Sequence, residues 1–342
     1  MRTTTQKKET ETMTMKWGIL GPGTIANKFA DTITQMSGEE QVLSAVGSRS
    51  FEKADAFAKK WNIPSAYGSY EEFLKDPEVE AVYIATPNCL HKEHTLMCLS
   101  AGKHVLCEKP FTINAEDARM LYQTAEEKGL FLMEGLWTRF LPLYHQIMEL
   151  IHSGTYGKLL HARADYGFAS SGARRERKFT SDLGGGALLD IGIYTLGFLT
   201  MVMEEMPVSF TSSVRFSEYG TDCFSAIQLN FSEGRTAHAV QSIGTVMDRR
   251  AALFFEKAQI HLTDFQNAFA MTVDPEGEEI FDILCPPKIN GFEYEIRDMS
   301  ECVALKRTSS KIYTSKESIA MMELLEKIRR SGNMSFSFEE EF

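Results

Sequence analysis

Short apolar runs alternate with amphipathic stretches through the first third of the chain. The runs predict strands at residues 16–20, 41–47, 81–85, 104–107 and 130–133. The stretches between them predict helices at residues 25–36, 51–61, 70–75, 91–101 and 115–128. Because strands that alternate with helices of this length form a parallel sheet covered on both faces, the pattern predicts an α/β domain.

The pattern changes after residue 135, where strand follows strand. A helix at 142–152 precedes alternating segments that predict strands at residues 159–168, 209–216, 224–231, 235–242, 251–255 and 259–262. Turn residues such as Ser232-Glu233-Gly234 separate them, so we expect a mostly antiparallel sheet, followed by a helix at 315–330. We therefore expect an α/β domain at 16–135 and an α+β domain at 136–342, after a disordered extension at 1–15.

The composition is that of a folded, acidic protein. Apolar residues make up 43% of the 342 residues, which is enough for a large core. The 36 Lys and Arg against 47 Asp and Glu give a net charge of −11, which disfavours nucleic acid and anionic membrane surfaces as partners. The six cysteines include no C-x-x-C pair and no zinc-ligand spacing, so we expect reduced thiols in a cytoplasmic protein and no metal.

Two segments bear on membrane association. Residues 1–16 contain no apolar run of the kind that a secretory signal has. Residues 185–203 are long and apolar enough to span a bilayer, but Asp190 would cost about 3 kcal/mol at the bilayer centre, and glycines weaken the segment further. We therefore expect a buried helix in a soluble protein.

A glycine-rich turn follows the first predicted strand and opens a helix. Its sequence, Gly21-Pro22-Gly23-Thr24-Ile25-Ala26, has the G-x-G-x-x-A pattern of dinucleotide-binding βαβ units. The first glycine makes the turn, the second lets the backbone approach a pyrophosphate, and the helix N-terminus favours the anion. We expect Gly21, Gly23, Thr24 and Ile25 to bind the cofactor; the alternative is an ordinary strand–helix turn.

The end of the second strand bears on which dinucleotide binds. NAD enzymes usually carry an acidic residue there for the ribose 2′-hydroxyl, whereas this chain has Ser48 and Arg49. Ser48 can hydrogen-bond a 2′-phosphate, and Arg49 can pair with it or stack on adenine. The sequence therefore favours NADP(H), while NAD(H) stays possible if Arg49 is simply a solvated residue at the start of the next helix.

Candidate chemistry lies at the ends of the later strands. Lys109, in Glu108-Lys109-Pro110, follows a strand at the carboxyl end of the sheet, where doubly wound folds bind ligands. A lysine there can transfer a proton to or from a carbonyl or alcohol; the alternative is a surface lysine. We expect Thr86, Pro87 and Asn88, at the end of the preceding strand, to line the nicotinamide side of the cleft. We expect His91, near the start of the next helix, to contact the cofactor.

Four segments in this order resemble the glucose–fructose oxidoreductase/inositol dehydrogenase (Gfo/Idh/MocA) family. They are Gly21-x-Gly23-x-x-Ala26, Ala85-Thr86-Pro87-Asn88-x-x-His91, Glu108-Lys109-Pro110 and residues 184–194, GGGALLDIGIY. With the stretches at 63–72 and 133–140, the chain is most similar to the dimeric dihydrodiol dehydrogenase branch. The resemblance implies an N-terminal Rossmann domain and a C-terminal domain whose open, mostly antiparallel sheet commonly forms a dimer interface. It also implies reversible NAD(P)-linked oxidation of sugars, polyols or diols without a metal.

The resemblance also implies roles for individual residues. Lys109 matches the family's catalytic lysine and Asp190 its aspartate, while Tyr194 stands where many members have histidine and fits the dihydrodiol branch, in which tyrosine is the proposed acid/base. Glu108, Trp137 and Arg139 match segments close to the cofactor; for Trp137 and Arg139 the alternative is an interdomain packing pair.

Spacing and charge suggest how this site would work. Asp190 and Tyr194 are four residues apart and share one face of a helix. We expect a neighbouring Lys109 to lower the pKa of Tyr194; the alternative is a packed core aromatic. Residues 184–186 predict a close backbone approach or a moving loop, and Arg174, Arg175 and Arg177 form either a solvated face or a cover over an anionic group.

Taken together, the sequence predicts an NADP(H)-dependent oxidoreductase. It would transfer hydride between the nicotinamide and a secondary alcohol or carbonyl of a diol, sugar or related small molecule, as a homodimer or higher homo-oligomer. One alternative is an NAD-preferring sugar or polyol dehydrogenase. The other is a non-catalytic NADP-binding regulator on the same fold.

Overall fold

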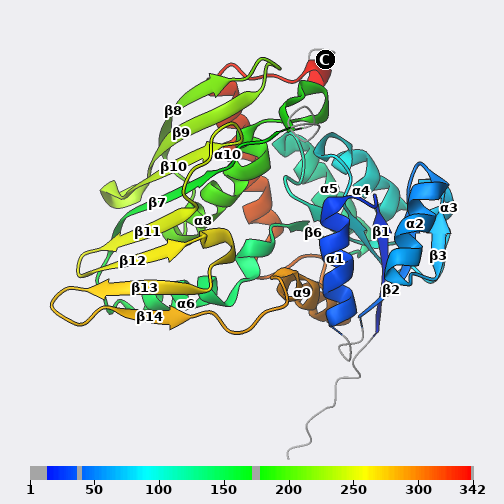
Figure 1. Cartoon of the computed structure of the whole chain (residues 1–342), viewed down its shortest axis with the longest axis horizontal. Coiled ribbons are helices and arrows are strands. Elements are labelled where there is room, and N and C mark those ends of the chain that lie inside the picture. Colours follow the sequence, from blue (N-terminus) through cyan, green and yellow to red (C-terminus); the bar gives the residue numbers. More distant parts are fainter. Residues whose placement is uncertain (1–13, 37–40, 172–177, 340–342) are drawn as a thin grey trace, which may run out of the picture.

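Six parallel strands form the first sheet, in the order β3-β2-β1-β4-β5-β6 (Figure 1). The computed structural model describes residues 14–36, 41–171 and 178–339. The strands are β1 (Met15–Leu20), β2 (Gln41–Gly47), β3 (Ser65–Tyr67), β4 (Ala81–Ile84), β5 (His104–Glu108) and β6 (Leu132–Gly135). This is the Rossmann order, and its switch point lies between the carboxyl ends of β1 and β4. The α/β prediction is confirmed; β3, only three residues long, was missed.

Helices cover both faces of this sheet and begin where polar residues cap them. They are α1 (Thr24–Gln35), α2 (Phe51–Trp61), α3 (Tyr70–Leu74), α4 (His91–Ser100) and α5 (Ala115–Lys128). The side chains of Ser50, Ser69 and Asn114 accept a backbone N–H bond at the starts of α2, α3 and α5. In contrast, α1 begins at Gly23 without a side-chain cap.

Eight strands form the second sheet, in the order β14-β13-β12-β11-β7-β10-β9-β8. The strands are β7 (Leu159–Gly167), β8 (Ser209–Phe216), β9 (Asp222–Asn230), β10 (Thr236–Ser242), β11 (Arg250–Phe255), β12 (Ala258–Thr263), β13 (Ala270–Pro275) and β14 (Phe281–Leu284). Only β7 and β10 pair in parallel among the described strands, so the sheet is mostly antiparallel, as predicted. The last two strands were not predicted.

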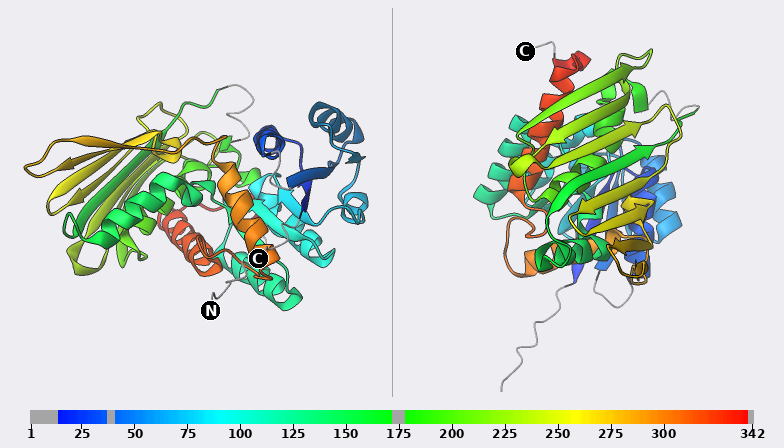
Figure 2. Two further views of the ribbon diagram at one scale, coloured as in Figure 1. Left: turned by 90° about the horizontal axis from the view of Figure 1, so that it is seen from below. Right: turned by 90° about the vertical axis from the view of Figure 1, so that its left-hand side faces the viewer.

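Within the described ranges, the second sheet carries helices on one face only. These are α6 (Pro142–Ser153), α8 (Ile193–Met203) and α10 (Ser315–Ser331), and Figure 2 shows the opposite face without a helical layer in the drawn part of the chain. The unpredicted α9 (Phe292–Ala304) packs against α1, and α10 packs against α5 (Figure 1). The last third of the chain therefore reaches back to the first sheet.

The longest apolar segment lies inside the protein. Residues 181–203 are long and apolar enough to cross a membrane, but 94% of the most apolar window is buried. Every residue of α8 is buried, so this segment is a core helix, as predicted.

Two predictions concern the edges of the described ranges. Met15, assigned to the extension, is instead buried in β1, because its side chain joins the core of the first sheet. Residues 1–13 lie outside the described residues, and so do Arg174, Arg175 and Arg177.

Candidate active site

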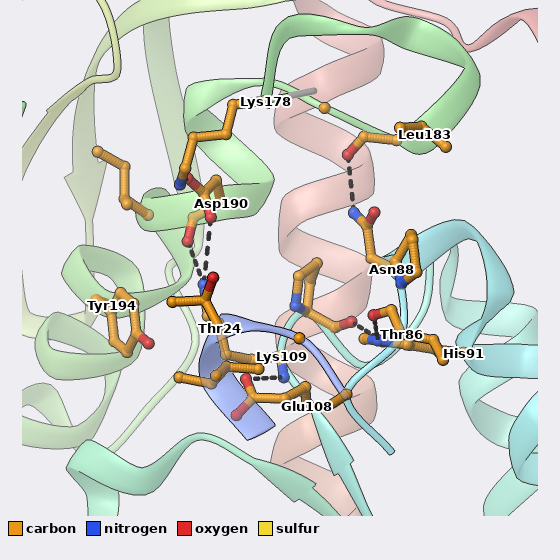
Figure 3. Close-up of a pocket in the computed structure, with 18 of the residues that line it drawn as sticks. Thr24, Thr86, Asn88, His91, Glu108, Lys109, Lys178, Leu183, Asp190 and Tyr194 are labelled. Atoms are coloured by element: carbon orange, nitrogen blue, oxygen red, sulfur yellow. Dashed lines mark hydrogen bonds and ion pairs between the residues drawn. The ribbon is translucent and has the colours of Figure 1, made fainter. Parts of the chain in front are cut away.

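A cavity of about 400 Å³ lies between the carboxyl ends of the first sheet and the segment that leads into α8 (Figure 3). Most of the predicted site residues line it together. They are Gly23, Thr24, Ile25, Thr86, Pro87, Asn88, His91, Glu108, Lys109, Asp190 and Tyr194. Residues from β5 and from the start of α8 thus meet in one pocket.

The turn before α1 fits a dinucleotide. Gly21 has a φ of +96°, and a Cβ on it would lie 2.9 Å from Thr86 Cγ2, so a side chain is excluded for two reasons. The atom nearest to a Cβ on Gly23 would be Ala85 O, at 3.9 Å. The space beside Gly23 is therefore open to a ligand. No side chain among the described residues caps α1, and its first turn has no acidic residue. The first N–H groups of α1 therefore suit a pyrophosphate.

Ser48 and Arg49 lie outside the cavity, beside the same turn. Gly21 N donates to Gly47 O at 3.0 Å, which brings the end of β2 next to the turn. Ser48 is buried, and its Oγ accepts from Ser50 N at 3.2 Å, whereas Arg49 is exposed. Of the two, only Arg49 therefore has its side chain in solvent at this end of the site.

Asp190 lies between two lysines (Figure 3). Lys109 Nζ donates to Asp190 O at 2.5 Å and lies 3.5 Å from Asp190 Oδ1, and Lys178 pairs with Asp190 Oδ2. Burial opposes ionisation, but the charges of Lys109 and Lys178 outweigh it and lower the pKa of Asp190. The carboxylate is therefore ionised at neutral pH. Sequence analysis missed Lys178 because it ends a charged run that resembles a solvated face.

Asp190 lies in a π-helical turn, η4 (Leu188–Gly192), which continues into α8 and Tyr194. Such turns widen a helix locally and are frequent at functional sites. Asp222 Oδ2 accepts from Leu188 N at 2.8 Å and so holds the start of this turn. Burial raises the pKa of Asp222 to about 7. No sequence motif marked Asp222 as a site residue.

The prediction for the pKa of Tyr194 is wrong. Lys109 Nζ lies over the ring of Tyr194, 4.7 Å from its centroid, rather than beside the hydroxyl. Trp137 Nε1 donates to Tyr194 OH at 3.2 Å. Burial and the nearby charge of Glu108 raise the pKa of Tyr194 well above its usual value. Tyr194 therefore keeps its hydroxyl proton at neutral pH.

Glu108 connects Lys109 to the interior. Its carboxylate accepts from Tyr83 OH and, at 3.2 Å, from Lys109 N. Burial raises the pKa of Glu108, while the charges of Lys109 and Lys28 act against that rise. Glu108 thus interacts electrostatically with Lys28 and Lys109, and Asp190 pairs with Lys109 and Lys178. These five residues, which alternate in sign, are hereafter the charge chain.

The inner end of the charge chain is enclosed by aromatic rings. Lys28 Nζ lies 4.2 Å from the ring centroids of both Trp137 and Phe292, and burial lowers the pKa of Lys28. Glu295, on α9, is fully buried, and neither carboxylate oxygen has a hydrogen-bond partner among the described residues. Burial and Glu108 raise the pKa of Glu295 well above its usual value, because a charged carboxylate without hydrogen-bond donors is costly to bury.

Trp137 and Arg139 do not line the cavity. Trp137 acts through its hydrogen bond to Tyr194 and its contact with Lys28. Arg139 pairs with Glu317 at 2.5 Å and lines a separate cavity of about 700 Å³ between α6, α8 and α10. The structure therefore does not bring Arg139 to the predicted cofactor site, because its side chain points to the other side of α8.

Two buried side chains hold the loops of the pocket. The ring nitrogens of His91 lie 2.9 Å from Pro110 O and Thr86 O, and burial lowers the pKa of His91 to about 4. Glu134 accepts from Phe111 N at 3.0 Å, Tyr313 OH at 3.0 Å and Ser318 Oγ at 2.6 Å. Burial raises the pKa of Glu134 to about 7. Within the described ranges, no three His, Cys, Asp or Glu side chains are grouped to hold a metal ion.

Comparisons with known proteins identify the family. Residues 15–136 match the oxidoreductase family with an NAD-binding Rossmann fold, and residues 144–261 match the GFO/IDH/MocA C-terminal domain. The chain is 34% identical over 335 residues to trans-1,2-dihydrobenzene-1,2-diol dehydrogenase of Mus musculus, covering 95% of this chain and 98% of the mouse protein. The chain belongs to the Gfo/Idh/MocA oxidoreductase family. It is an oxidoreductase that acts on CH–OH groups with a nicotinamide cofactor.

Solved structures of similar proteins agree with the fold. Aldose-aldose oxidoreductase from Caulobacter crescentus is 27% identical, with a TM-score of 0.83 over 93% of this chain and 97% of that protein. The 3-ketoreductase KijD10 from Actinomadura kijaniata, solved with NADP and TDP-benzene, has a TM-score of 0.84 at 23% identity over 92% of this chain and 97% of that protein. Both share the two-sheet architecture of this Gfo/Idh/MocA member.

Proposed function

We propose that this protein transfers hydride between NADP(H) and a secondary alcohol or carbonyl of a diol, sugar or related small molecule. The observation that carries the proposal is one cavity lined both by the turn before α1 and by Lys109, Asp190 and Tyr194. The diol dehydrogenase and aldose oxidoreductase relatives support the substrate class. The bound nicotinamide supplies the hydride chemistry.

The residues of this chain then handle the proton. Asp190 holds the Lys109 ammonium in place. In reduction, Tyr194 or Lys109 gives a proton to the new alkoxide oxygen. In oxidation, the substrate hydroxyl gives its proton to the same residue, which is then deprotonated. Because Tyr194 keeps its proton at neutral pH, it is then in the form that the reduction step requires.

Preference for NADP(H) rests on Ser48 and Arg49 at the end of β2. Arg49 is exposed at this end of the site, which supports pairing of its guanidinium with a 2′-phosphate. We expect Arg49→Ala to weaken NADP⁺ binding about tenfold or more and to leave NAD⁺ binding nearly unchanged, because only NADP⁺ carries that phosphate. Titration of both cofactors into both proteins measures this. An equal loss for both cofactors would mean that Arg49 does not contact the 2′-phosphate and would remove this support for NADP(H).

We also propose a cytoplasmic homodimer, divided into a cofactor domain at 16–135 and a second domain at 136–342. The uncovered face of the eight-stranded sheet supports the dimer (Figure 2), and six free cysteines, three of them buried, suit a reducing compartment. Sedimentation at micromolar concentration should give twice the chain mass of 38.6 kDa. A monomer under these conditions contradicts the dimer.

Turnover tests the function directly. Diols, aldoses and keto-aldehydes are screened by absorbance at the nicotinamide band, with Lys109→Met as the control. We expect at least one class to be turned over by the wild-type protein and far more slowly by the variant. Bound NADPH without turnover of any class would instead favour the non-catalytic regulator.

A further inference from the structure

Asp222 contacts the turn that carries Asp190 from a distant part of the chain. It is the first residue of β9 and is buried. Its Oδ2 accepts from Leu188 N at 2.8 Å, across 34 residues. Leu188 begins η4, where helical N–H groups lack partners within the helix. The carboxylate of Asp222 therefore caps the π-helical turn from the second sheet.

The residue before the turn is held against the same carboxylate. Gly186 has a φ of +120°, and a Cβ on it would clash with Asp222 Oδ1, so a side chain is excluded for two reasons. Gly186 O in turn accepts from Asp190 N at 3.1 Å. One carboxylate thus contacts both Gly186 and Leu188, and the backbone of Gly186 is bonded directly to Asp190.

The backbone of the turn, and not only the Asp190 carboxylate, binds Lys109. Lys109 Nζ donates to Asp190 O at 2.5 Å and lies 3.5 Å from Asp190 Oδ1 (Figure 3). In a regular α-helix, this carbonyl would accept from the N–H of Tyr194, four residues on. A π-helical turn replaces such bonds by bonds to the fifth residue, which displaces its carbonyls. The path of η4 therefore decides where the ammonium lies relative to Tyr194.

Asp222 is itself held in a fixed place. β9 lies between β8 and β10 in the second sheet. Asp222 N donates to Met334 Sδ at 3.4 Å, and the neighbouring Thr221 Oγ1 donates to Phe179 O at 2.6 Å. Both Thr221 and Asp222 are buried. The position of the turn is thereby tied to that of the sheet.

We propose that Asp222 is a positioning residue for hydride transfer, because by holding the π-helical turn it places both oxygens of Asp190 that fix the Lys109 ammonium. This inference rests on the proposed function, since it adds a residue to the same site. The described residues that line the cavity do not include Asp222, so it acts through Asp190. Its Oδ2 accepts from Leu188 N whether the carboxyl is charged or neutral.

Two variants separate positioning from stability. Asp222→Ala removes the acceptor for Leu188 N, whereas Asp222→Asn keeps an oxygen that can accept. The kcat is measured per NADPH-binding site, counted by titration, so that unfolded protein does not enter the rate. We expect Asp222→Ala to lower kcat about 10- to 100-fold with KM within about threefold, because a misplacement of about 1 Å can cost about 10²-fold. Asp222→Asn should keep at least about a third of the wild-type kcat.

Asp76→Ala is the matched control. Asp76 is also a buried acid whose carboxylate accepts a backbone N–H, from Glu78 at 2.9 Å. It precedes β4 and so lies at the end of the first sheet opposite the cavity. Its replacement should lower the free energy of unfolding and leave kcat per site within about twofold of wild type.

A double-mutant cycle with Lys109→Met tests the route of the effect. If Asp222 acts through the contact between Asp190 and Lys109, Asp222→Ala should cost less than about threefold once Lys109 is replaced. If Asp222→Ala does not fold, Asp222→Ser, whose shorter side chain cannot reach Leu188 N, takes its place.

Four results overturn the inference while the proposed function stands. They are a wild-type kcat in the variant that lacks the acceptor, additive losses in the cycle, an equal loss in Asp76→Ala, and an Asp222→Asn variant as slow as Asp222→Ala. No turnover of any substrate by wild-type protein that binds NADPH overturns both.

Discussion

The cofactor side of the pocket is built from backbone, whereas the opposite side is built from charged side chains. At the turn before α1, two glycines and an uncapped helix start leave N–H groups and open space. Across the cavity, Lys109, Asp190 and Lys178 form ion pairs between segments that are 81 residues apart in the case of Lys109 and Asp190. The difference separates two tasks: the first sheet positions the cofactor, and the junction with α8 moves the proton.

The largest effect that would sharpen this comparison is expected from Lys109→Met. Lys109 contacts Asp190 and the ring of Tyr194 but takes no part in the turn before α1. We expect kcat/KM to fall about 10²- to 10⁴-fold, which is typical for the loss of a proton-transfer group, while the Kd for NADPH changes less than about threefold. A large loss of NADPH affinity with normal kcat would show that Lys109 belongs to the cofactor side.

Glu134 joins the loop that follows Lys109 to Tyr313 and Ser318, and its replacement should change the pH dependence of stability. Its pKa is about 7 in the folded protein against an ordinary value of 4.5, so the folded state binds more protons between these pH values. The free energy of unfolding should therefore fall by roughly 3 kcal/mol from this group as the pH rises from 4.5 to 7.

Glu134→Gln should remove that contribution. The amide can accept from Phe111 N and donate to the hydroxyls of Tyr313 and Ser318, because both hydroxyls can also accept. Urea unfolding at pH 5 and pH 8 should show the variant gaining stability relative to the wild-type protein at the higher pH. Parallel curves for the two proteins would mean that Glu134 does not titrate in this range.

A smaller effect, confined to the cofactor side, is expected from Gly23→Ala. The added Cβ meets nothing closer than 3.9 Å in the protein, so Tm should stay within about 2 °C of the wild-type value. The same methyl group occupies the space that a pyrophosphate needs, so NADPH affinity should fall about tenfold. Calorimetric titration and thermal unfolding measure both; equal affinity would move the pyrophosphate away from this turn.

The cofactor side could be predicted from sequence because its determinants are local. Gly21 and Gly23 lie within one turn between a strand and a helix, and the ends of β4 and β5 follow from the alternation of elements. The charged side could be predicted only where the family resemblance marked it, at Lys109, Asp190 and Tyr194. Lys178, Glu134 and Asp222 carry no local signal, since their roles arise from contacts between distant segments.

Elements missed by the sequence analysis have equally physical causes. The buried face of α9 includes Glu293 and Glu295, which conceal its apolar period. Glu293 is accommodated there by backbone N–H bonds from Ile289, Asn290 and Gly291. The residues of β14 are mostly exposed and show no buried face. The pKa of Tyr194 was mispredicted because burial and the charge of Glu108 raise it, while the Lys109 ammonium lies over the ring instead of beside the hydroxyl.

Tyr194→Phe tests the separation of tasks most directly. The variant keeps the ring that contacts Lys109 and removes only the hydroxyl that faces Trp137. With the best substrate of the screen, we predict a loss of kcat/KM of about 10² or more and an NADPH Kd within about twofold of the wild-type value. A kcat/KM within twofold of wild type would contradict the assignment of proton transfer to the α8 side of the pocket.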